Sequence, residues 1–159
     1  MLVIYEPDYK NLSAVYSGYN TSMDIVKKHV PVFVNHKGIM LDDDKQVIQH
    51  MEKYRVVEEV IGKSRCELKP LAELKLSKSQ IVSNGSDESV LNITLSELQP
   101  EDNISGIDVF FNGTASNQPV SDNLLKLPIS SVTPGTIEIK VNSKLFRANS
   151  VVLEVVSGG

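Results

Sequence analysis

Short segments in which apolar and polar residues alternate recur throughout the second half of the chain. In one of them, Leu91, Ile93 and Leu95 alternate with Asn92 and Thr94. Successive side chains of a β-strand point to opposite faces, so this spacing places the three apolar residues on one buried face. β-Branched residues, with Gly and Pro at the breaks, disfavour helix. The segment is therefore predicted to be a half-buried strand, and repetition of this pattern restricts the region to β-rich folds.

Turn residues separate these segments, at Asn84–Gly85, Asn112–Gly113 and Pro134–Gly135. The alternation recurs in segments 89–95, 106–111, 125–129, 137–141 and 151–155, preceded by a split first strand over 74–76 and 80–82. About seven strands at intervals of about ten residues predict a sandwich of two sheets. The chain has no tryptophan and one cysteine, so aliphatic side chains must supply the core.

Three of these segments resemble bacterial immunoglobulin-like (Ig-like) domains of the invasin type. The matching residues are Ser83–Asp87, Asn92–Leu95 and Thr133–Thr136, and the resemblance extends over about residues 71–156. It implies an Ig-like β-sandwich that presents a surface and performs no chemistry, as found in virion proteins of tailed bacteriophages. The chain departs from antibody-type domains because no cysteine pair, core tryptophan or tyrosine corner can be assigned.

The amino-acid composition changes near Pro70. All five tyrosines, all three histidines and the cysteine precede this residue, whereas phenylalanine is the only aromatic residue type that follows it. Two separately packed bodies are therefore predicted: a small α+β anchoring domain over residues 1–69 and the Ig-like sandwich over residues 70–159. Segment 67–73 is the expected connector, because Pro70 has a fixed φ and disfavours helix at the residue before it.

The first domain mixes strand and helix patterns. Strands are expected over 2–5, 30–34 and 39–41, with a turn over 35–38. A helix is expected over 42–54, because acidic residues crowd its first turn and one face is apolar, formed by Val47, Ile48, Met51 and Tyr54. Residues 55–61 either extend this helix or form a strand, which their Val and Ile content favours. The element order over 30–62 loosely resembles segments of minor virion proteins of tailed bacteriophages.

Few residues are arranged for chemistry. Nothing near Cys66 would activate a thiolate, so a semi-buried structural thiol is expected. His29, His36 and His50 lack the spacing of a zinc site or a general base. The run Asp42–Asp44 does not match an EF-hand loop, where a glycine is needed at the sixth position. We therefore expect no enzyme activity, no cofactor and no metal.

The net charge of −4 is concentrated in the second domain. Residues 1–70 contain ten basic and ten acidic residues, whereas residues 71–159 contain six and ten. An acidic surface does not attract phosphate backbones, so nucleic-acid binding is not expected. Solubility is the favoured role of these acids, and Ca²⁺ binding is an alternative for Asp87, Glu88, Glu101, Asp102 and Asp108.

The apolar runs of the chain are short. None approaches the roughly 18 to 20 residues of a membrane span, so no membrane insertion is expected. The first apolar residues, Met1–Tyr5, meet Glu6, Pro7 and Asp8 at once, unlike a secretory signal. We therefore expect a protein made in the host cytoplasm.

Four tyrosines lie close together near the N-terminus: Tyr5, Tyr9, Tyr16 and Tyr19. Gly, Ser and Asn surround them, which suits an ordered contact with a partner chain. The same rings could equally fill the core of a small domain, and the sequence leaves both roles open.

Together these observations favour a non-catalytic structural protein of a tailed-bacteriophage virion. In this hypothesis residues 1–69 attach to capsid or tail proteins in many copies on a lattice. The Ig-like domain is displayed outward as an auxiliary or decoration module, with a host-surface protein or glycan as an additional partner. The alternative is a bacterial surface adhesion or binding module that uses sandwich loops such as 102–105 or 115–122, and an enzyme or enzyme-accessory domain is the least favoured hypothesis.

Overall fold

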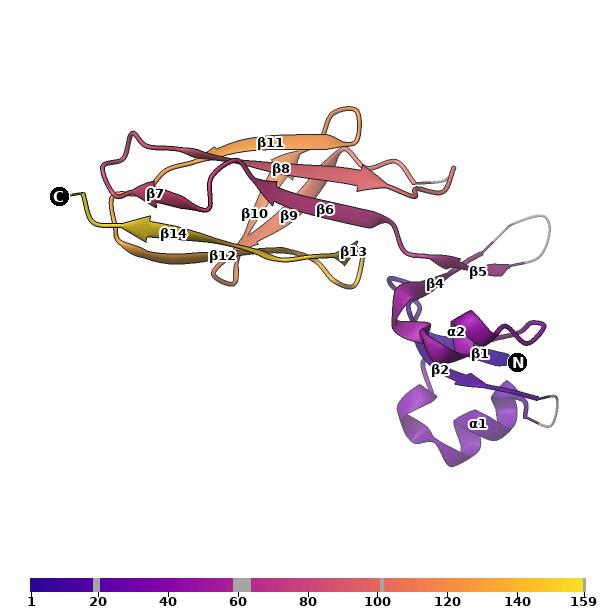
Figure 1. The fold of residues 1–159 in the computed structure, drawn as a ribbon. Coiled ribbons are helices and arrows are strands. Elements are labelled where there is room, and N and C mark those ends of the chain that lie inside the picture. Colours follow the sequence, from indigo (N-terminus) through magenta and orange to yellow (C-terminus); the bar gives the residue numbers. More distant parts are fainter. Residues whose placement is uncertain (19–20, 59–63, 101, 159) are drawn as a thin grey trace. The chain divides into compact units, whose positions relative to one another are not determined.

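The computed structural model describes residues 1–18, 21–58, 64–100 and 102–158 (Figure 1). The chain divides into two compact units, Met1–Lys69 and Pro70–Gly159. Buried apolar side chains form separate clusters within each unit. The fold is mainly β, with a small α+β unit followed by an Ig-like β-sandwich.

A three-stranded antiparallel sheet forms the centre of the first unit. Its strands are β1 (Leu2–Tyr5), β2 (Leu12–Tyr16) and β3 (Lys37–Met40), in the order β2-β1-β3. Between β2 and β3 the chain forms helix α1 (Met23–His29) and the 3₁₀ helix η1 (Pro31–Phe33). After β3 come α2 (Lys45–Gln49), the 3₁₀ helix η2 (Met51–Lys53), and the antiparallel pair β4 (Tyr54–Val57) and β5 (Arg65–Leu68).

Strand β1 is buried because different elements cover the two faces of its sheet. Leu2 and Ile4 cluster with Val26 of α1 on one face. Val3 clusters with Val47 of α2 on the other face, together with apolar residues of β4. Alternate residues of a strand point to opposite faces, so the continuous apolar run of β1 is what a strand covered on both sides requires.

Helix α1 and strand β2 were not predicted from the sequence. The helix begins at a cap, where the backbone N–H of Ile25 donates to the Ser22 hydroxyl at 3.3 Å. Lys27 and Lys28 lie in its last turn, where the helix dipole favours positive charge. These signals are present in the sequence, but the helix has only seven residues, which gives little room for an apolar periodicity.

The strand predicted over residues 30–34 is wrong, because this segment forms η1. Pro31 stands at the start of the 3₁₀ turn, and the N–H of Val34 donates to the Pro31 carbonyl at 3.1 Å. Proline fits the first turn of a helix, where its missing N–H is not needed. The turn predicted over 35–38 also ends early, since β3 already begins at Lys37.

The helix predicted over residues 42–54 is shorter than expected. Asp44 is its N-cap, and its carboxylate accepts hydrogen bonds from the N–H groups of Gln46 at 2.9 Å and Val47 at 3.4 Å. The preceding aspartates therefore lie outside the helix. At His50 the backbone leaves helical geometry, and a 3₁₀ turn follows. Of the segment 55–61, the part in β4 is a strand as favoured, and residues 59–61 lie outside the described residues.

Nine strands form the second unit over its described residues: β6 (Leu71–Leu76), β7 (Gln80–Val82), β8 (Ser89–Ser96), β9 (Gly106–Phe111), β10 (Thr114–Pro119), β11 (Leu124–Ile129), β12 (Gly135–Val141), β13 (Arg147–Ala148) and β14 (Val151–Val156). One sheet has the order β11-β8-β6-β13, and the other has the order β10-β9-β12-β14-β7. Figure 1 shows the two sheets as the layers of a sandwich. Only Lys69 and Pro70 separate β5 from β6, so the predicted connector over 67–73 is too long.

The sandwich core is aliphatic. Leu91 and Ile93 of β8 pack in one buried cluster with Ile139 of β12 and Leu153 of β14. Phe146 is also buried in this cluster. The inward positions predicted from the alternation in β8 are confirmed, because Leu91, Ile93 and Leu95 are all buried.

The split first strand belongs to both sheets. Strand β6 pairs with β8 in one sheet, whereas β7 runs parallel to β14 in the other. At the crossing, the fully buried Ser89 hydroxyl donates to the Lys78 carbonyl at 2.6 Å and accepts from the Lys78 N–H at 3.1 Å. Asp87 accepts from the Val82 N–H at 2.9 Å and pairs with the Lys78 ammonium at 2.7 Å. These bonds fix the point where the chain changes sheets.

Candidate functional site

The four tyrosines proposed as a partner-binding surface have different environments. Tyr5 is only 3% exposed, and its hydroxyl donates to the Glu58 carboxylate at 2.7 Å. Tyr16 packs in the cluster on the opposite face of the sheet, Tyr9 is 40% exposed, and Tyr19 lies outside the described residues. For Tyr5 and Tyr16 the core role left open by the sequence therefore fits the structure. The described tyrosines do not share one face.

Glu58 links Tyr5 to the rim of the first unit. The Lys37 ammonium also donates to its carboxylate, at 3.2 Å. Burial and the hydrogen bond to Glu58 raise the pKa of Tyr5, and the hydrogen bonds from Tyr5 and Lys37 lower the pKa of Glu58. The neutral Tyr5 phenol therefore donates to a charged Glu58 carboxylate, and this hydrogen bond gives Tyr5 a structural role.

The most exposed large apolar side chains of the first unit's described part lie in α1 and the turn after it. Ile25 is 50% exposed, Val32 70% and Val34 58%. Val26, which follows Ile25, is buried against the sheet, so Ile25 and Val26 have opposite environments. We call Ile25, Val32 and Val34, with the exposed Lys27 nearby, the α1–η1 surface. Sequence reasoning missed this surface because it predicted a strand over residues 30–34 and no helix over 23–29.

The other candidate chemical groups of the first unit are held in local structure. Burial raises the pKa of the Cys66 thiol from 9.0 to about 11, in agreement with a half-buried structural thiol. The ring of His36 packs edge-on against Phe33, with centroids 5.2 Å apart. Asp43 pairs with the amino group of Met1 at 2.7 Å, which lowers the pKa of this carboxyl.

Three of the five acidic residues considered for Ca²⁺, Asp87, Asp102 and Asp108, have local partners. Asp87 holds Lys78 and the backbone of Val82. Asp102 accepts from the Gln99 N–H at 2.8 Å, and Asp108 accepts from the Asn117 amide at 2.9 Å. Glu101 lies outside the described residues. No group of three or more His, Cys, Asp or Glu side chains placed to hold a metal occurs in the part of the chain that the structure describes.

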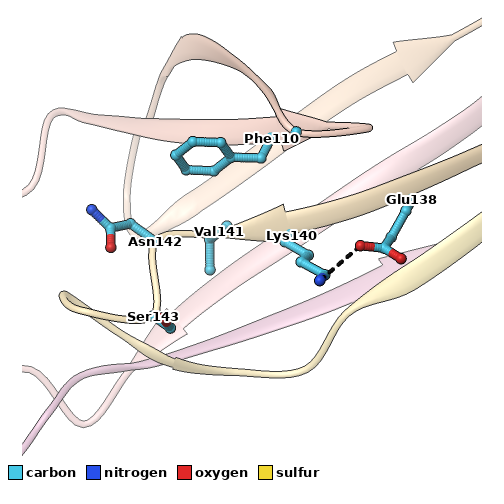
Figure 2. Close-up of a pocket in the computed structure, with 7 residues that line it drawn as sticks. Phe110, Glu138, Lys140, Val141, Asn142 and Ser143 are labelled. Atoms are coloured by element: carbon cyan, nitrogen blue, oxygen red, sulfur yellow. Dashed lines mark ion pairs between the residues drawn. The ribbon is translucent and has the colours of Figure 1, made fainter.

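A shallow hollow of about 270 Å³ opens on the outer face of the five-stranded sheet (Figure 2). Phe110 of β9 lies directly opposite Lys140 of β12 and Ala115 of β10. The Lys140 ammonium pairs with the Glu138 carboxylate at 2.7 Å. Asn142, just after β12, closes one end of the hollow. Because neighbouring Phe111 packs against the core, the alternation of β9 turns Phe110 outward.

A second hollow of about 210 Å³ adjoins the first. The two share Lys140, Val141 and Ser143, so they meet at the end of β12. The second is completed by Ala148, Asn149 and Ser150 from the segment that leads into β14. We call the two together the β12-end groove. Sequence reasoning did not find this groove. The signal that could have indicated it is Phe110, an aromatic residue at an outward position of the alternating segment 106–111.

Among the described residues, no helix combines the length and apolar character needed to cross a lipid bilayer.

Comparison with known proteins adds three solved structures to these observations. A C-terminal intimin fragment, solved in complex with the intimin-binding domain of the translocated intimin receptor (Tir), is 19% identical over 52% of this chain and 31% of its own, with a TM-score of 0.34. Domains 1–6 of the surface layer protein SbsC are 19% identical over 61% of this chain and 15% of their own, with a TM-score of 0.36. Invasin, described as a bacterial integrin-binding protein, is 18% identical over 99% of this chain and 32% of its own, with a TM-score of 0.39.

The chain thus spans about a third or less of the length of these three structures. No protein-family profile and no curated protein sequence matches the chain. The assignment of the second unit as an Ig-like sandwich rests on its own two sheets and their strand order.

Proposed function

We propose that the protein is a non-catalytic attachment protein. Its first unit binds a protein partner through the α1–η1 surface, and its Ig-like domain is displayed. The observation that carries this proposal is the outward position of three large aliphatic side chains, Ile25, Val32 and Val34, within ten residues of sequence.

The α1–η1 surface has the composition of the centre of an interface. Burying one valine or isoleucine side chain contributes about 1.5 to 3 kcal/mol before the losses of association are counted. The small unit already contains buried apolar clusters on both faces of its sheet, so these residues are not needed to complete a core. Three large apolar side chains exposed within ten residues of sequence are a feature expected of a protein contact site.

The charges beside these residues indicate the kind of partner. Lys27 and Lys28 are exposed in the last turn of α1, and Asp24 is the acidic residue of its first turn. The local excess of positive charge favours a partner whose rim is acidic, because complementary charge speeds association and selects among partners.

Two settings fit this proposal. In the first, the partner is a capsid or tail protein of a tailed bacteriophage, the protein is made in the host cytoplasm, and many copies on one lattice provide avidity. In the second, the chain is an adhesion or binding module at a bacterial surface. Both settings use the same division of labour between the two units.

Co-sedimentation tests the proposal and separates the settings. Full-length protein is mixed with purified virions or with bacterial cell envelopes, and the bound fraction in the pellet is measured. We expect binding to one of the two particles, and residues 70–159 alone should stay in the supernatant.

A matched pair of substitutions tests the surface. Val32→Asp should lower the bound fraction at least about tenfold, since a buried unpaired carboxylate opposes association. Ile48→Asp, at an exposed position of α2 in the same unit, should bind as the wild type does. Failure to bind either particle, or equal binding by Val32→Asp and wild type, contradicts the proposal.

A further inference from the structure

We propose that the β12-end groove binds a short chain of neutral sugar residues. The proposal concerns the Ig-like domain alone and does not depend on the attachment function of the first unit. It rests on the side chains of the groove, their charge balance and the division of the groove into two hollows.

An aromatic ring, that of Phe110, lines the groove. Phe110 is half-buried on the outer face, and its cross-strand neighbours are the small Ala115 and the long Lys140. Figure 2 shows the ring on the same side of the hollow as Asn142, with the Lys140 and Glu138 side chains towards the other end. The C–H face of a pyranose ring is flat and apolar, so a ring of this kind can stack on an aromatic face while its hydroxyls remain at the edge.

Polar side chains also line the groove. Lys140 supplies an ammonium donor, Glu138 a carboxylate acceptor and Asn142 an amide that has both. The Asn142 carbonyl oxygen accepts from the Lys144 N–H at 2.9 Å, which fixes the orientation of the amide. Groups that donate and groups that accept therefore line the same hollow as the ring, as vicinal hydroxyls require.

The charged side chains of the groove neutralise each other. Lys140 is paired with Glu138, so no net charge remains at this end of the groove. An anionic ligand would compete with Glu138 for the ammonium, and a cationic ligand would compete with Lys140 for the carboxylate. A neutral ligand can hydrogen-bond to both members of the pair and leave it intact. This favours neutral sugars over sulfated or uronic-acid chains.

The volumes of the two hollows limit the size of the ligand. The hollows, of about 270 and 210 Å³, are both smaller than typical small-molecule sites, whose volumes are about 300 to 1,000 Å³. Each therefore suits one ring and not a larger ligand. Because they adjoin and share lining residues, a chain of two or more linked rings can occupy both. Longer oligosaccharides should bind more tightly than monosaccharides.

The test is an NMR titration of the full-length protein, followed through backbone amide signals. The probes are maltotetraose, cellotetraose, chitotetraose and mannotetraose, their monosaccharides, and a heparin-derived tetrasaccharide as the anionic probe. We expect at least one neutral tetrasaccharide to shift the signals of Phe110 and Asn142 with a Kd of about 1 mM or lower. Its monosaccharide should bind at least about fivefold more weakly, and the heparin fragment should bind more weakly still.

Three variants locate the site. Phe110→Ala and Phe110→Leu should each weaken binding at least about tenfold, the second because it keeps apolar bulk and loses the ring face. Val152→Ala removes another apolar side chain from the outer face, outside the groove, and should leave Kd within about twofold. Both positions point away from the core, and amide spectra verify the fold of each of the three variants.

Three results would overturn the proposal. They are no shifts with any neutral tetrasaccharide at 20 mM, unchanged affinity in both Phe110 variants, or tighter binding of the heparin fragment than of every neutral sugar. Co-sedimentation through the first unit is measured separately, so a failure here leaves the attachment function standing.

Discussion

The side chain of Asn149 takes the place of a missing strand next to β6. Strand β13 has only two residues and pairs with Leu71 and Ala72 of β6. Beyond it, the Asn149 amide accepts from the Leu74 N–H at 2.9 Å and donates to the Leu74 carbonyl at 2.9 Å. Leu74 is only 2% exposed, so these two backbone groups depend on Asn149 for their hydrogen bonds.

Asn149→Ala should destabilise the Ig-like domain by about 2 to 3 kcal/mol. Each hydrogen bond contributes about 0.5 to 1.5 kcal/mol net, and a buried backbone group left without a partner adds about 1 to 3 kcal/mol. Water can replace part of the lost hydrogen bonding, because β13 is the edge strand of its sheet and solvent can reach this edge. In a domain of this size 1 kcal/mol corresponds to about 4 to 8 °C, so Tm should fall by about 10 to 20 °C.

The assay is thermal and urea unfolding of the full-length protein, followed by circular dichroism. Asn149→Asp tests the donor separately, because a carboxylate keeps the bond to the Leu74 N–H but repels the Leu74 carbonyl. It should therefore also destabilise the domain. Asn117→Ala is the control, since the Asn117 amide bonds only to the exposed Asp108 side chain and its loss should change stability by less than about 0.5 kcal/mol. If Asn149→Ala shifts Tm as little as the control does, Asn149 does not substitute for a strand.

Three further outcomes are expected. Leu153→Ala should destabilise the sandwich by about 3 kcal/mol, whereas Val152→Ala on the same strand should cost under about 1 kcal/mol; equal effects in denaturant unfolding would refute the assigned faces. Cys66 should react with a disulfide reagent at pH 8 about 100-fold more slowly in the native protein than in guanidinium, because its raised pKa of about 11 leaves little thiolate; similar rates would argue for an exposed thiol. The hydrogen bond from Lys78 lowers the pKa of Asp87, so its stabilisation is present above its unfolded pKa of 3.8 and is lost as pH falls through the folded value. Asp87→Asn should weaken the acid dependence of Tm below about pH 4, and an unchanged pH profile would contradict this contribution.

Alternation predicted the sandwich because a half-buried strand leaves a two-residue period in its sequence. Leu91, Ile93 and Leu95 follow that rule, and all three are buried. Strand β10 was missed because it has no large apolar residue to mark an inward face, and its residues are at most partly buried. Its pairing is set by the preceding turn, where Asn112 and Gly113 have φ of 48° and 85°.

The first unit was harder to predict because its elements are short. A single proline converts residues 30–34 from an apparent strand into η1, and a single capping aspartate moves the start of α2 to Lys45. Both effects depend on local hydrogen bonds that apolar periodicity does not record. For the same reason the α1–η1 surface could not be predicted. The tyrosine spacing predicted an aromatic cluster near the N-terminus. It could not predict that Tyr5 is buried and Tyr9 exposed, because both roles use the same residue type.

The parallel pairing of β7 with β14 determines how the Ig-like domain would resist a pull along the chain. Tension that enters before β7 and leaves after β14 draws these two neighbours past each other in opposite directions, along their length. Bonds that bridge such a pair are loaded together and do not open one after another. In a domain that is stretched between an anchor and a moving object, this pair of strands would therefore provide the main resistance to mechanical unfolding.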